Sequence, residues 1–256
     1  MFKLGKLFPK LDKRTMMFSN IIREPMLPPL PDEWEFSKQY PKLDLSPRVW
    51  LNDRLGNCVY VSSLAQQRDF EVFEEGKVIE PDEKVIEQEY LKEAGGDHGL
   101  VMLNHLNVWR QHGLPFGPKR KLLCLNMGAS RYKIYAYATL NPQRIREFKY
   151  ATFLLGCNIG LAMPNSFMTQ FAAGHPWDDT SGPPNPYNGH AVKVRGWTKD
   201  GLLLWTWGKL QLASWNWIAS YTDEAYVIID NRNDWLGDQS PIDIPMAEGY
   251  LKEITA

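Results

Sequence analysis

The apolar residues of this chain change their spacing at about residue 133, and that change limits the fold to few classes. Before it, apolar residues recur at helical intervals; after it, stretches rich in β-branched and aromatic residues are typical of strands. Helices that precede an antiparallel-looking sheet predict an α+β fold rather than a doubly wound parallel sheet. The expected strands are Lys133 to Leu140, Thr152 to Met163, His190 to Trp197, Leu202 to Trp207 and Ala225 to Asp230.

A helix is favoured directly after Cys58, where apolar residues continue at partly helical spacing. A strand is the alternative, because Val59 and Val61 are β-branched and alternate with Tyr60. Cap and break signals predict three further helices. These are a segment from Pro81-Asp82 through Leu91 ended by Gly95-Gly96, a segment capped by Asp97 that runs to Gly113, and a short helix with Asn141 as its cap and Pro142 at its first position.

Residues 1 to 45 differ in composition from the rest of the chain. Four prolines occur between Pro25 and Pro31, and they favour extended, polyproline-like backbone. We therefore divide the chain into an extended, Pro-rich N-terminal arm (1–45) and a domain (46–256). The arm is expected to pack along its own domain or a neighbouring subunit; a ligand for a proline-binding module is the less favoured alternative.

The charges nearly cancel, with 29 Lys plus Arg against 30 Asp plus Glu. This balance provides no broad attraction for nucleic acid or an anionic membrane, so neither is an expected partner. The 256 residues are 44% hydrophobic, enough to bury the core of one large domain or two small ones.

The three cysteines, Cys58, Cys124 and Cys157, are widely spaced and odd in number. They do not resemble a disulfide framework, and a reducing compartment fits them better. The basic start of the chain is interrupted by charges and Pro9, unlike a signal peptide. We expect a soluble, cytoplasmic protein.

His98, His105 and His112 recur every seven residues on one predicted helical face. Seven residues rise about 10.5 Å along a helix, too far for three ligands of one zinc ion. We interpret them as surface or core-edge histidines and expect no metal. His175, before Pro176, is interpreted as a surface loop residue. No phosphate-binding glycine loop occurs, and no cofactor is expected.

Cys58 and His190 have settings that suit chemistry. A thiol in the first turn of a helix lies near backbone N–H groups and the positive end of the helix dipole, which favour the nucleophilic thiolate. Gly56 allows a tight turn before it. His190 follows Gly189 at the start of a strand, where a general base could face a cleft. Taken singly, each residue is more simply a structural one.

Three stretches together resemble the papain-like cysteine peptidases. They are NDRLGNC (52–58), NGHAV (188–192) and LLLWTWG (202–208), and the closing SYTDEAYVIID (220–230) is similar to the last strand of that family. The resemblance spans about residues 46 to 235. It implies a nucleophile helix in an N-terminal helical part that packs on a C-terminal antiparallel sheet.

The resemblance implies that Cys58 is the nucleophile and His190 the base. It also implies that the backbone N–H of Cys58 and the side chain of Asn52, where the family has Gln, hold the oxyanion. The family's orienting Asn is replaced by Trp205, which has no acceptor. We expect Thr206 to point to the opposite face from Trp205, so that the orienting hydrogen bond is lost, while Trp207 covers the imidazole.

Two functions follow. The first is a cysteine hydrolase that cleaves an amide, most simply a peptide bond, in a peptide or protein substrate. The second is a catalytically degenerate structural protein of a bacteriophage virion, in capsid or tail, whose residues 1–45 grip neighbouring subunits. The shortened motifs, NDxxGxC at residues 52–58 and TWG at residues 206–208, resemble those of reduced papain-like proteins carried by bacteriophages, which implies a location in the host cytoplasm or the virion.

Overall fold

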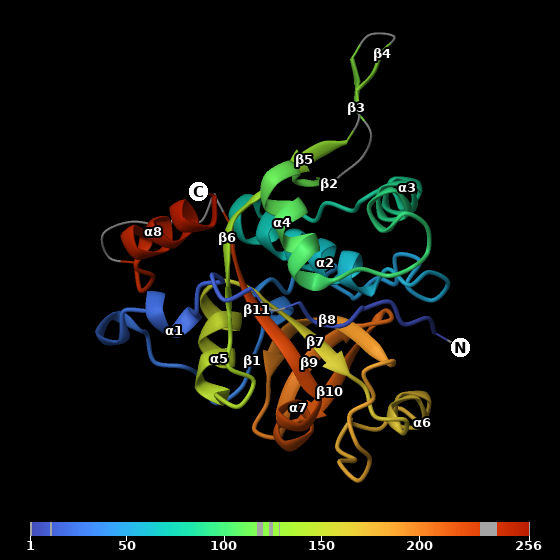
Figure 1. The fold of residues 1–256 in the computed structure, drawn as a ribbon, viewed down its shortest axis with the longest axis vertical. Helices are drawn as coiled ribbons and strands as arrows, with labels where there is room; N and C mark the ends of the chain where they lie inside the picture. Colours follow the sequence, from blue (N-terminus) through green and yellow to red (C-terminus); the bar gives the residue numbers. More distant parts are fainter. Residues whose placement is uncertain are drawn as a thin grey trace.

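The computed structural model describes residues 2–10, 12–116, 120–122, 125–127, 129–230 and 240–255. It confirms the α+β class: α2, α3 and α4 lie together on one side of the molecule, and most of the antiparallel sheet lies on the other (Figure 1). The sheet has the strand order β10-β9-β8-β7-β11-β6, and β1 pairs with β8 off this path. Its main strands are β6 (Ile134–Thr139), β7 (Cys157–Ala162), β8 (Gly189–Trp197), β9 (Gly201–Thr206), β10 (Lys209–Ser214) and β11 (Thr222–Asp230).

The helix predicted after Cys58 is α2 (Cys58–Glu75), the longest described helix, and it packs against β8. The next helix, α3 (Glu83–Ala94), begins and ends as predicted, because Asp82 accepts from the N–H groups of Lys84 and Val85 and Gly95 adopts a left-handed conformation. The third, α4 (Met102–His112), begins later than predicted. Asp97 does not cap it, since its carboxylate accepts from the N–H of Gly56 in the loop before α2.

Two boundaries in the second half were predicted wrongly. Residues Thr152 to Leu154 end the helix α5 (Ile145–Leu154) instead of beginning a strand. That helix starts three residues after Pro142, because Asn141 accepts from the N–H of Gln143 and closes a turn. The edge strand β10 was not predicted; the turn at Trp207-Gly208 returns the chain to pair with β9.

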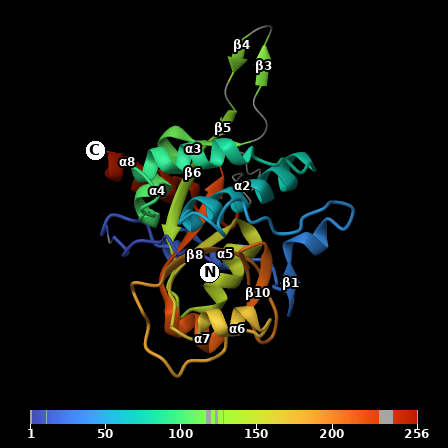
Figure 2. The ribbon, with the colours of Figure 1, turned by 90° about the vertical axis from the view of Figure 1, so that its right-hand side faces the viewer.

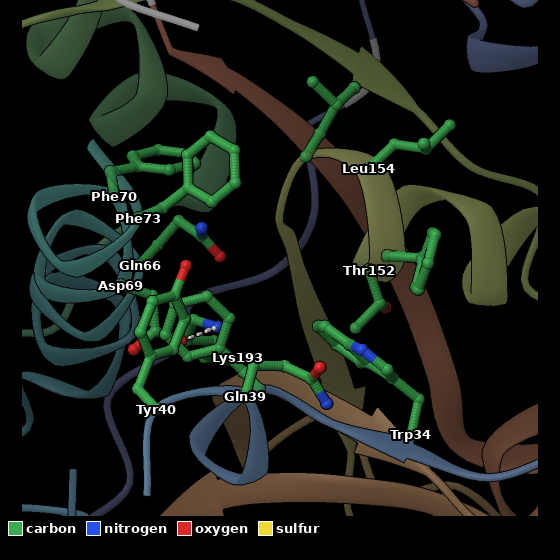
Figure 3. Close-up of a pocket in the computed structure, with 13 residues that line it drawn as sticks. Trp34, Gln39, Tyr40, Gln66, Asp69, Phe70, Phe73, Thr152, Leu154 and Lys193 are labelled. Carbon is green, nitrogen blue, oxygen red and sulfur yellow. Dashed lines mark ion pairs between the residues drawn. The ribbon is translucent and has the colours of Figure 1, made fainter. Parts of the chain in front are cut away.

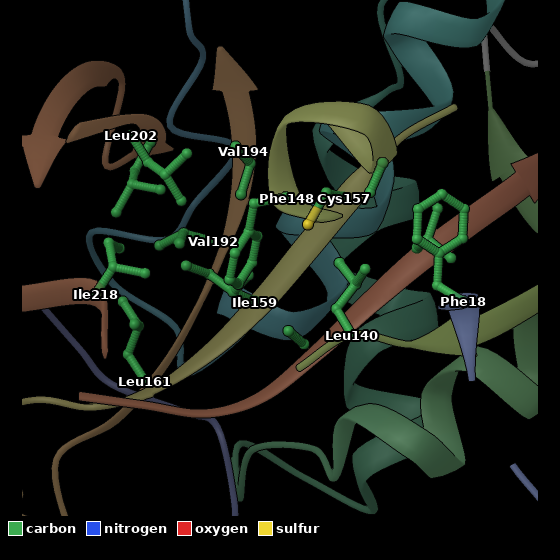
Figure 4. Packing of buried hydrophobic residues seen from close by; sticks show 14 of the residues in the cluster. Phe18, Leu140, Phe148, Cys157, Ile159, Leu161, Val192, Val194, Leu202 and Ile218 are labelled. Atoms are coloured by element: carbon green, nitrogen blue, oxygen red, sulfur yellow. The ribbon is translucent and has the colours of Figure 1, made fainter. Parts of the chain in front are cut away.

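The sheet separates two hydrophobic clusters. The larger cluster packs α5 and α7 (Trp215–Tyr221) against one face, with Phe148, Ile159 and Val192 at its centre (Figure 4). Cys157 belongs to this cluster and is fully buried among apolar side chains, so it has a packing role. The smaller cluster packs α2 and α4 against the opposite face.

Residues 1–45 contain short elements that pack on the chain's own domain: α1 (Phe18–Ile21), η1 (Glu24–Met26), β1 (Trp34–Glu35) and η2 (Phe36–Gln39). Phe18 and Ile21 are buried in the larger cluster, and Trp34 pairs with Trp197 of β8. The proline-rich stretch therefore runs over the domain surface here. A grip on neighbouring subunits stays a prediction.

The remaining elements lie outside the central layers. They are β2 (Leu114–Phe116), β3 (Arg120–Leu122), β4 (Leu125–Met127), β5 (Ser130–Tyr132), α6 (Phe167–Ala172) and α8 (Ile244–Thr255). In the view of Figure 2, α6 and α7 lie at the end of the sheet away from α3 and α4. No helix among the described residues is long and apolar enough to cross a membrane.

Candidate active site

Cys58 is the first residue of α2 and is 1% exposed. Its Sγ accepts a hydrogen bond, at 3.4 Å, from the backbone N–H of Ala191, the residue after His190. The structure thus brings the predicted nucleophile against the strand that carries the predicted base. The turn before Cys58 is held by Asp97, which accepts from the N–H of Gly56 and the hydroxyl of Tyr90.

His190 lies in β8, completely buried, with one ring nitrogen bonded and the other not. Its Nε2 is 2.7 Å from the hydroxyl oxygen of Thr206. Its Nδ1 is buried and has no hydrogen-bond partner within the described part of the chain. The ring of Trp207 stacks on the imidazole, with centroids 4.2 Å apart and planes 15° from parallel, as expected. This environment fixes the orientation of the imidazole.

The expectation that the orienting hydrogen bond is lost was wrong. Side chains alternate along β9, so Trp205 faces the smaller cluster, where its indole N–H donates to the backbone of Arg48. Thr206 points the opposite way, as predicted, but that is the face on which His190 lies. A hydroxyl has both donor and acceptor capacity, and Thr206 can therefore accept from Nε2–H.

Asn52 lies in the loop before α2 and is 2% exposed. Its side-chain nitrogen donates to Asn57 Oδ1 at 3.1 Å and to the carbonyl of Leu55 at 3.4 Å. Both N–H groups are therefore used inside the loop. The bond to Leu55 is at the long end of the hydrogen-bond range, so that N–H is the one a stronger acceptor could recruit. Oxyanion binding by Asn52 stays a prediction.

The first residues of the chain run between α2 and the sheet (Figure 1). The N–H of Lys6 donates to the carbonyl of Gly189 at 3.1 Å, and the N–H of Leu100 donates to the carbonyl of Gly5 at 2.8 Å. The backbone of Gly5 faces the sulfur of Cys58 and acts to lower the pKa of its thiol. A segment of this chain (residues 2–7, here called the covering segment) thus closes the site, which we did not predict.

The start of the covering segment is anchored by aromatic packing. Phe2 stacks on Trp207, with centroids 5.1 Å apart, and meets Phe171 edge-on at 5.5 Å. Trp207 therefore contacts both the imidazole of His190 and the ring of Phe2. Lys3, the next residue, pairs with Asp97. Through Asp97, which accepts from the N–H of Gly56, the covering segment is connected to the turn before Cys58.

Burial decides the charge of the reactive pair in this closed state. Burial raises the pKa of the Cys58 thiol, and the N–H of Ala191, the backbone of Gly5 and the charge of Lys6 oppose this only in part. Burial, and then the positive charge of Lys6, lowers the pKa of His190 to about 3. At neutral pH the closed chain therefore holds a neutral thiol and a neutral imidazole.

The other histidines lie at the surface or at the edge of the core. His98, His112 and His175 are exposed, and His105 is buried with its Nδ1 2.8 Å from Glu93. No group of three or more His, Cys, Asp or Glu side chains is placed to hold a metal ion within the described ranges. Cys124 lies outside those ranges.

A separate pocket opens further along α2, with a cavity of about 260 Å³ (Figure 3). Gln66, Asp69, Phe70 and Phe73 of α2 line one side of it, and Trp34 and Thr152 lie on the other side. The carboxylate of Asp69 pairs with Lys193 at 2.7 Å and with Arg195 at 3.3 Å. Neither Cys58 nor His190 lines this pocket.

Solved structures of cysteine proteases are similar to this chain over most of its length. Xylellain, a cysteine protease from Xylella fastidiosa, is similar with a TM-score of 0.67 at 16% identity, over 90% of this chain and 97% of that one. The chain has the papain-like cysteine protease fold. Procathepsin B S9 from Trypanosoma congolense is similar with a TM-score of 0.62 at 13% identity, over 88% of this chain and 86% of that one.

A third papain-like structure, the Carica candamarcensis cysteine protease CMS1MS2 in complex with E-64, has a TM-score of 0.57 at 15% identity. It is matched over its whole length by 79% of this chain. No protein-family model and no curated protein matches the sequence. The papain-like fold of this chain is thus recognised through its three-dimensional structure.

Proposed function

We propose that the chain is a cysteine hydrolase that cleaves an amide bond, most simply a peptide bond, with Cys58 as nucleophile and His190 as base. The observation that carries the proposal is the setting of His190. One ring nitrogen is bonded to Thr206, the other has no partner, and Trp207 holds the ring beside the strand position that contacts the sulfur. Such an oriented imidazole next to a helix-start thiol is suited to proton transfer.

The first chemical step follows from the two nitrogens of His190. Thr206 accepts from Nε2–H, which leaves the lone pair of Nδ1 to take the thiol proton of Cys58. The sulfur then attacks the carbonyl carbon of the substrate and forms a tetrahedral intermediate. The N–H of Cys58 holds the oxyanion, joined by the side chain of Asn52 once it releases Leu55.

The second half of the reaction returns the proton. Nδ1–H protonates the leaving amine as the carbon–nitrogen bond breaks, and an acyl-sulfur ester remains. Water then loses a proton to the same nitrogen and attacks the ester, so that the acid leaves and the thiol is restored. His190 thus serves as base and acid in turn, and Thr206 keeps its ring in one orientation.

The covering segment must leave before a substrate can bind. In the closed chain it presents the backbone of Gly5 to the sulfur, while the carbonyl of Gly5 is bonded to Leu100. A nucleophile needs a carbonyl carbon about 3–3.5 Å away in an aligned geometry. The covering segment therefore occupies the site in the closed chain, with the carbonyl of Gly5 held by Leu100.

The test opens the folded chain without deleting any of it. A recognition sequence for a specific protease is inserted between the exposed Lys13 and Arg14, and the purified protein is cleaved there after folding. We expect the opened protein to hydrolyse fluorogenic peptides, and Cys58→Ser to reduce this at least about 10⁴-fold. Cys157→Ser is the matched control, and it should leave hydrolysis unchanged.

Alkylation of the thiol by iodoacetamide gives a second readout. In the opened protein, labelling of Cys58 should persist well below the ordinary thiol pKa of about 8.5 and should slow in His190→Ala. Labelling that follows the ordinary thiol pKa, together with no hydrolysis, would overturn the proposal. The structural virion role would then be the remaining hypothesis; the bacteriophage assignment itself rests only on the short motifs.

A further inference from the structure

The pocket beside α2 contains buried polar groups that are not paired within the fold. Gln66 is 1% exposed, and its Oε1 has no hydrogen-bond partner among the described residues. Thr152, in the last turn of α5, is 6% exposed, and its hydroxyl is likewise without a partner there. Figure 3 shows the amide of Gln66 directed into the pocket from α2 and Thr152 on the opposite side. Two unpaired groups of this kind destabilise a fold, so their position at one cavity indicates a ligand that pairs with them.

The amide of Gln66 owes its place to the residue behind it. A Cβ at position 156 would lie 2.1 Å from Nε2 and 2.4 Å from Oε1 of Gln66. A side chain there would displace the amide, and Gly156 leaves room for it against the backbone. The acceptor is therefore in position before a ligand arrives, which lowers the entropy that binding costs.

The walls of the pocket are aromatic. Trp34 and Phe36 of the N-terminal arm, Phe70 and Phe73 of α2, and Phe153 of α5 line it. Trp34 meets Phe36 at 6.3 Å and Phe153 at 5.5 Å between centroids, edge-on in both cases. Aromatic side chains pack favourably on the ring of a flat ligand. A cavity of about 150 Å³ is enough for benzene, so the 260 Å³ found here suits one or two rings.

The charged groups at the pocket are paired with one another. Asp69 Oδ2 lies 2.7 Å from Lys193 Nζ and 3.3 Å from Arg195 Nε, and the same nitrogen of Arg195 lies 3.4 Å from Glu35 Oε1. All four residues are buried, and their two positive charges balance two negative ones. A charged ligand would bring an uncompensated charge into buried surroundings. The pocket therefore favours a neutral ligand.

We propose that this pocket binds a neutral, flat aromatic molecule of one or two rings that carries hydrogen-bonding groups at two opposite edges. One edge donates to Oε1 of Gln66, and the other bonds to the hydroxyl of Thr152, which can donate and accept. The aromatic side chains enclose the rings between these two groups. Neither Cys58 nor His190 lines the pocket, so this binding does not depend on the hydrolase function proposed above.

The test titrates the full-length, unopened protein with 5-hydroxyindole and with indole, followed by ligand-detected NMR. The first probe is neutral and carries an N–H group and a hydroxyl group at opposite ends of two fused rings; the second lacks the hydroxyl. We expect a Kd for 5-hydroxyindole on the order of 0.1 to 1 mM, as suits a ligand of about ten heavy atoms. Indole should bind about 10-fold more weakly, because it leaves one buried group unpaired.

Variants of the pocket should remove that preference. Gln66→Met/Thr152→Val keeps the size of both side chains and removes both polar groups, so the two probes should bind it within about two-fold of each other. Thr152→Ser keeps the hydroxyl and should keep the preference. Gln111→Met, at an exposed position outside the pocket, is the matched control and should leave both affinities unchanged.

Thermal unfolding separates a binding role from a structural one. Because neither polar group has a partner among the described residues, the double variant should unfold at the temperature of the parent or above it. If it folds poorly, Gln66→Met alone and Thr152→Val alone replace it, and each should weaken binding of 5-hydroxyindole about 10-fold.

Tighter binding of 5-hydroxyindole by the parent, with the preference lost in the pocket variants, supports the site. Three results would overturn it. They are no binding of either probe at millimolar concentration, equal affinity of the parent for both probes, and a preference that survives in the pocket variants.

Discussion

Two regions along helix α2 differ in how their space is filled. At the start of the helix, Cys58 and His190 are covered by residues 2–7, and the pair is neutral. Two to four turns later, the pocket beside Asp69 is open and holds an ion pair with Lys193. Cys58 and His190 do not line this cavity, and Cys58 is 1% exposed. The proposed active site is therefore located by the orientation of Cys58 and His190 and not by the open cavity.

Among variants that compare the covered site with the open pocket, Lys6→Met in the full-length chain is expected to have the largest effect on the alkylation rate of Cys58. Methionine keeps the length of the side chain but removes the bonds to Asp223 and Glu224, which weakens closure by about 1.5–3 kcal/mol, or roughly 10- to 150-fold. Alkylation of Cys58 by iodoacetamide, read by mass spectrometry, should accelerate by that factor. Gln39→Ala, which changes the open pocket, should leave the rate unchanged; equal acceleration by both variants would contradict the role of Lys6.

The neutral state of buried His190 predicts that the free energy of unfolding depends on pH. His190 has a folded pKa of about 3 against an ordinary value near 6.5. Below pH 6.5 the unfolded chain binds a proton that the folded chain does not, so the free energy of unfolding falls as pH falls, until about pH 3. Between pH 7 and 5 this loss amounts to about 2 kcal/mol.

Urea unfolding of the parent and of His190→Asn at both pH values isolates this contribution. The variant should lose about 2 kcal/mol less than the parent over the interval. Asn is chosen because it keeps a polar side chain near Thr206. Identical losses in the two proteins would mean that the imidazole is protonated in the folded chain, and the neutral pair would be wrong.

The smallest effect is expected at Thr206. Thr206→Val keeps the shape and removes the acceptor of Nε2–H, so the opened protein should lose about 10-fold in kcat with little change in KM. Thr206→Ser retains the hydroxyl and should restore most of the rate. A shift of the lower limb of the pH–rate profile in the valine variant separates loss of positioning from simple loss of packing. Equal rates for Val and Ser would show that the hydroxyl is not needed.

The sequence allowed the fold to be predicted where the signals were local. The glycine before Cys58, the cap at Asp82 and the Gly-His pair each act within a few residues, and their elements were confirmed. Thr206 was misjudged for a different reason. Its alternation against Trp205 was predicted, but which face carries His190 depends on the pairing of β8 with β9 and β7.

The covering segment could not be predicted from local signals. Lys6 meets Asp223 more than two hundred residues along the chain, and a lone lysine near the start of a sequence has no distinguishing pattern. Asp97 was assigned to a helix cap because it precedes a helical pattern, yet a carboxylate serves the N–H of Gly56 equally well. Tertiary contacts between distant segments decided both cases.

The backbone of Gly5 passes so close to the turn before Cys58 that a methyl group on its Cα would lie 1.7 Å from the carbonyl oxygen of Gly56. The covering segment can therefore lie over the thiol only because residue 5 has no Cβ. An alanine at this position would hold the segment away from Cys58, so a single substitution more than fifty residues from Cys58 in the sequence would expose the thiol.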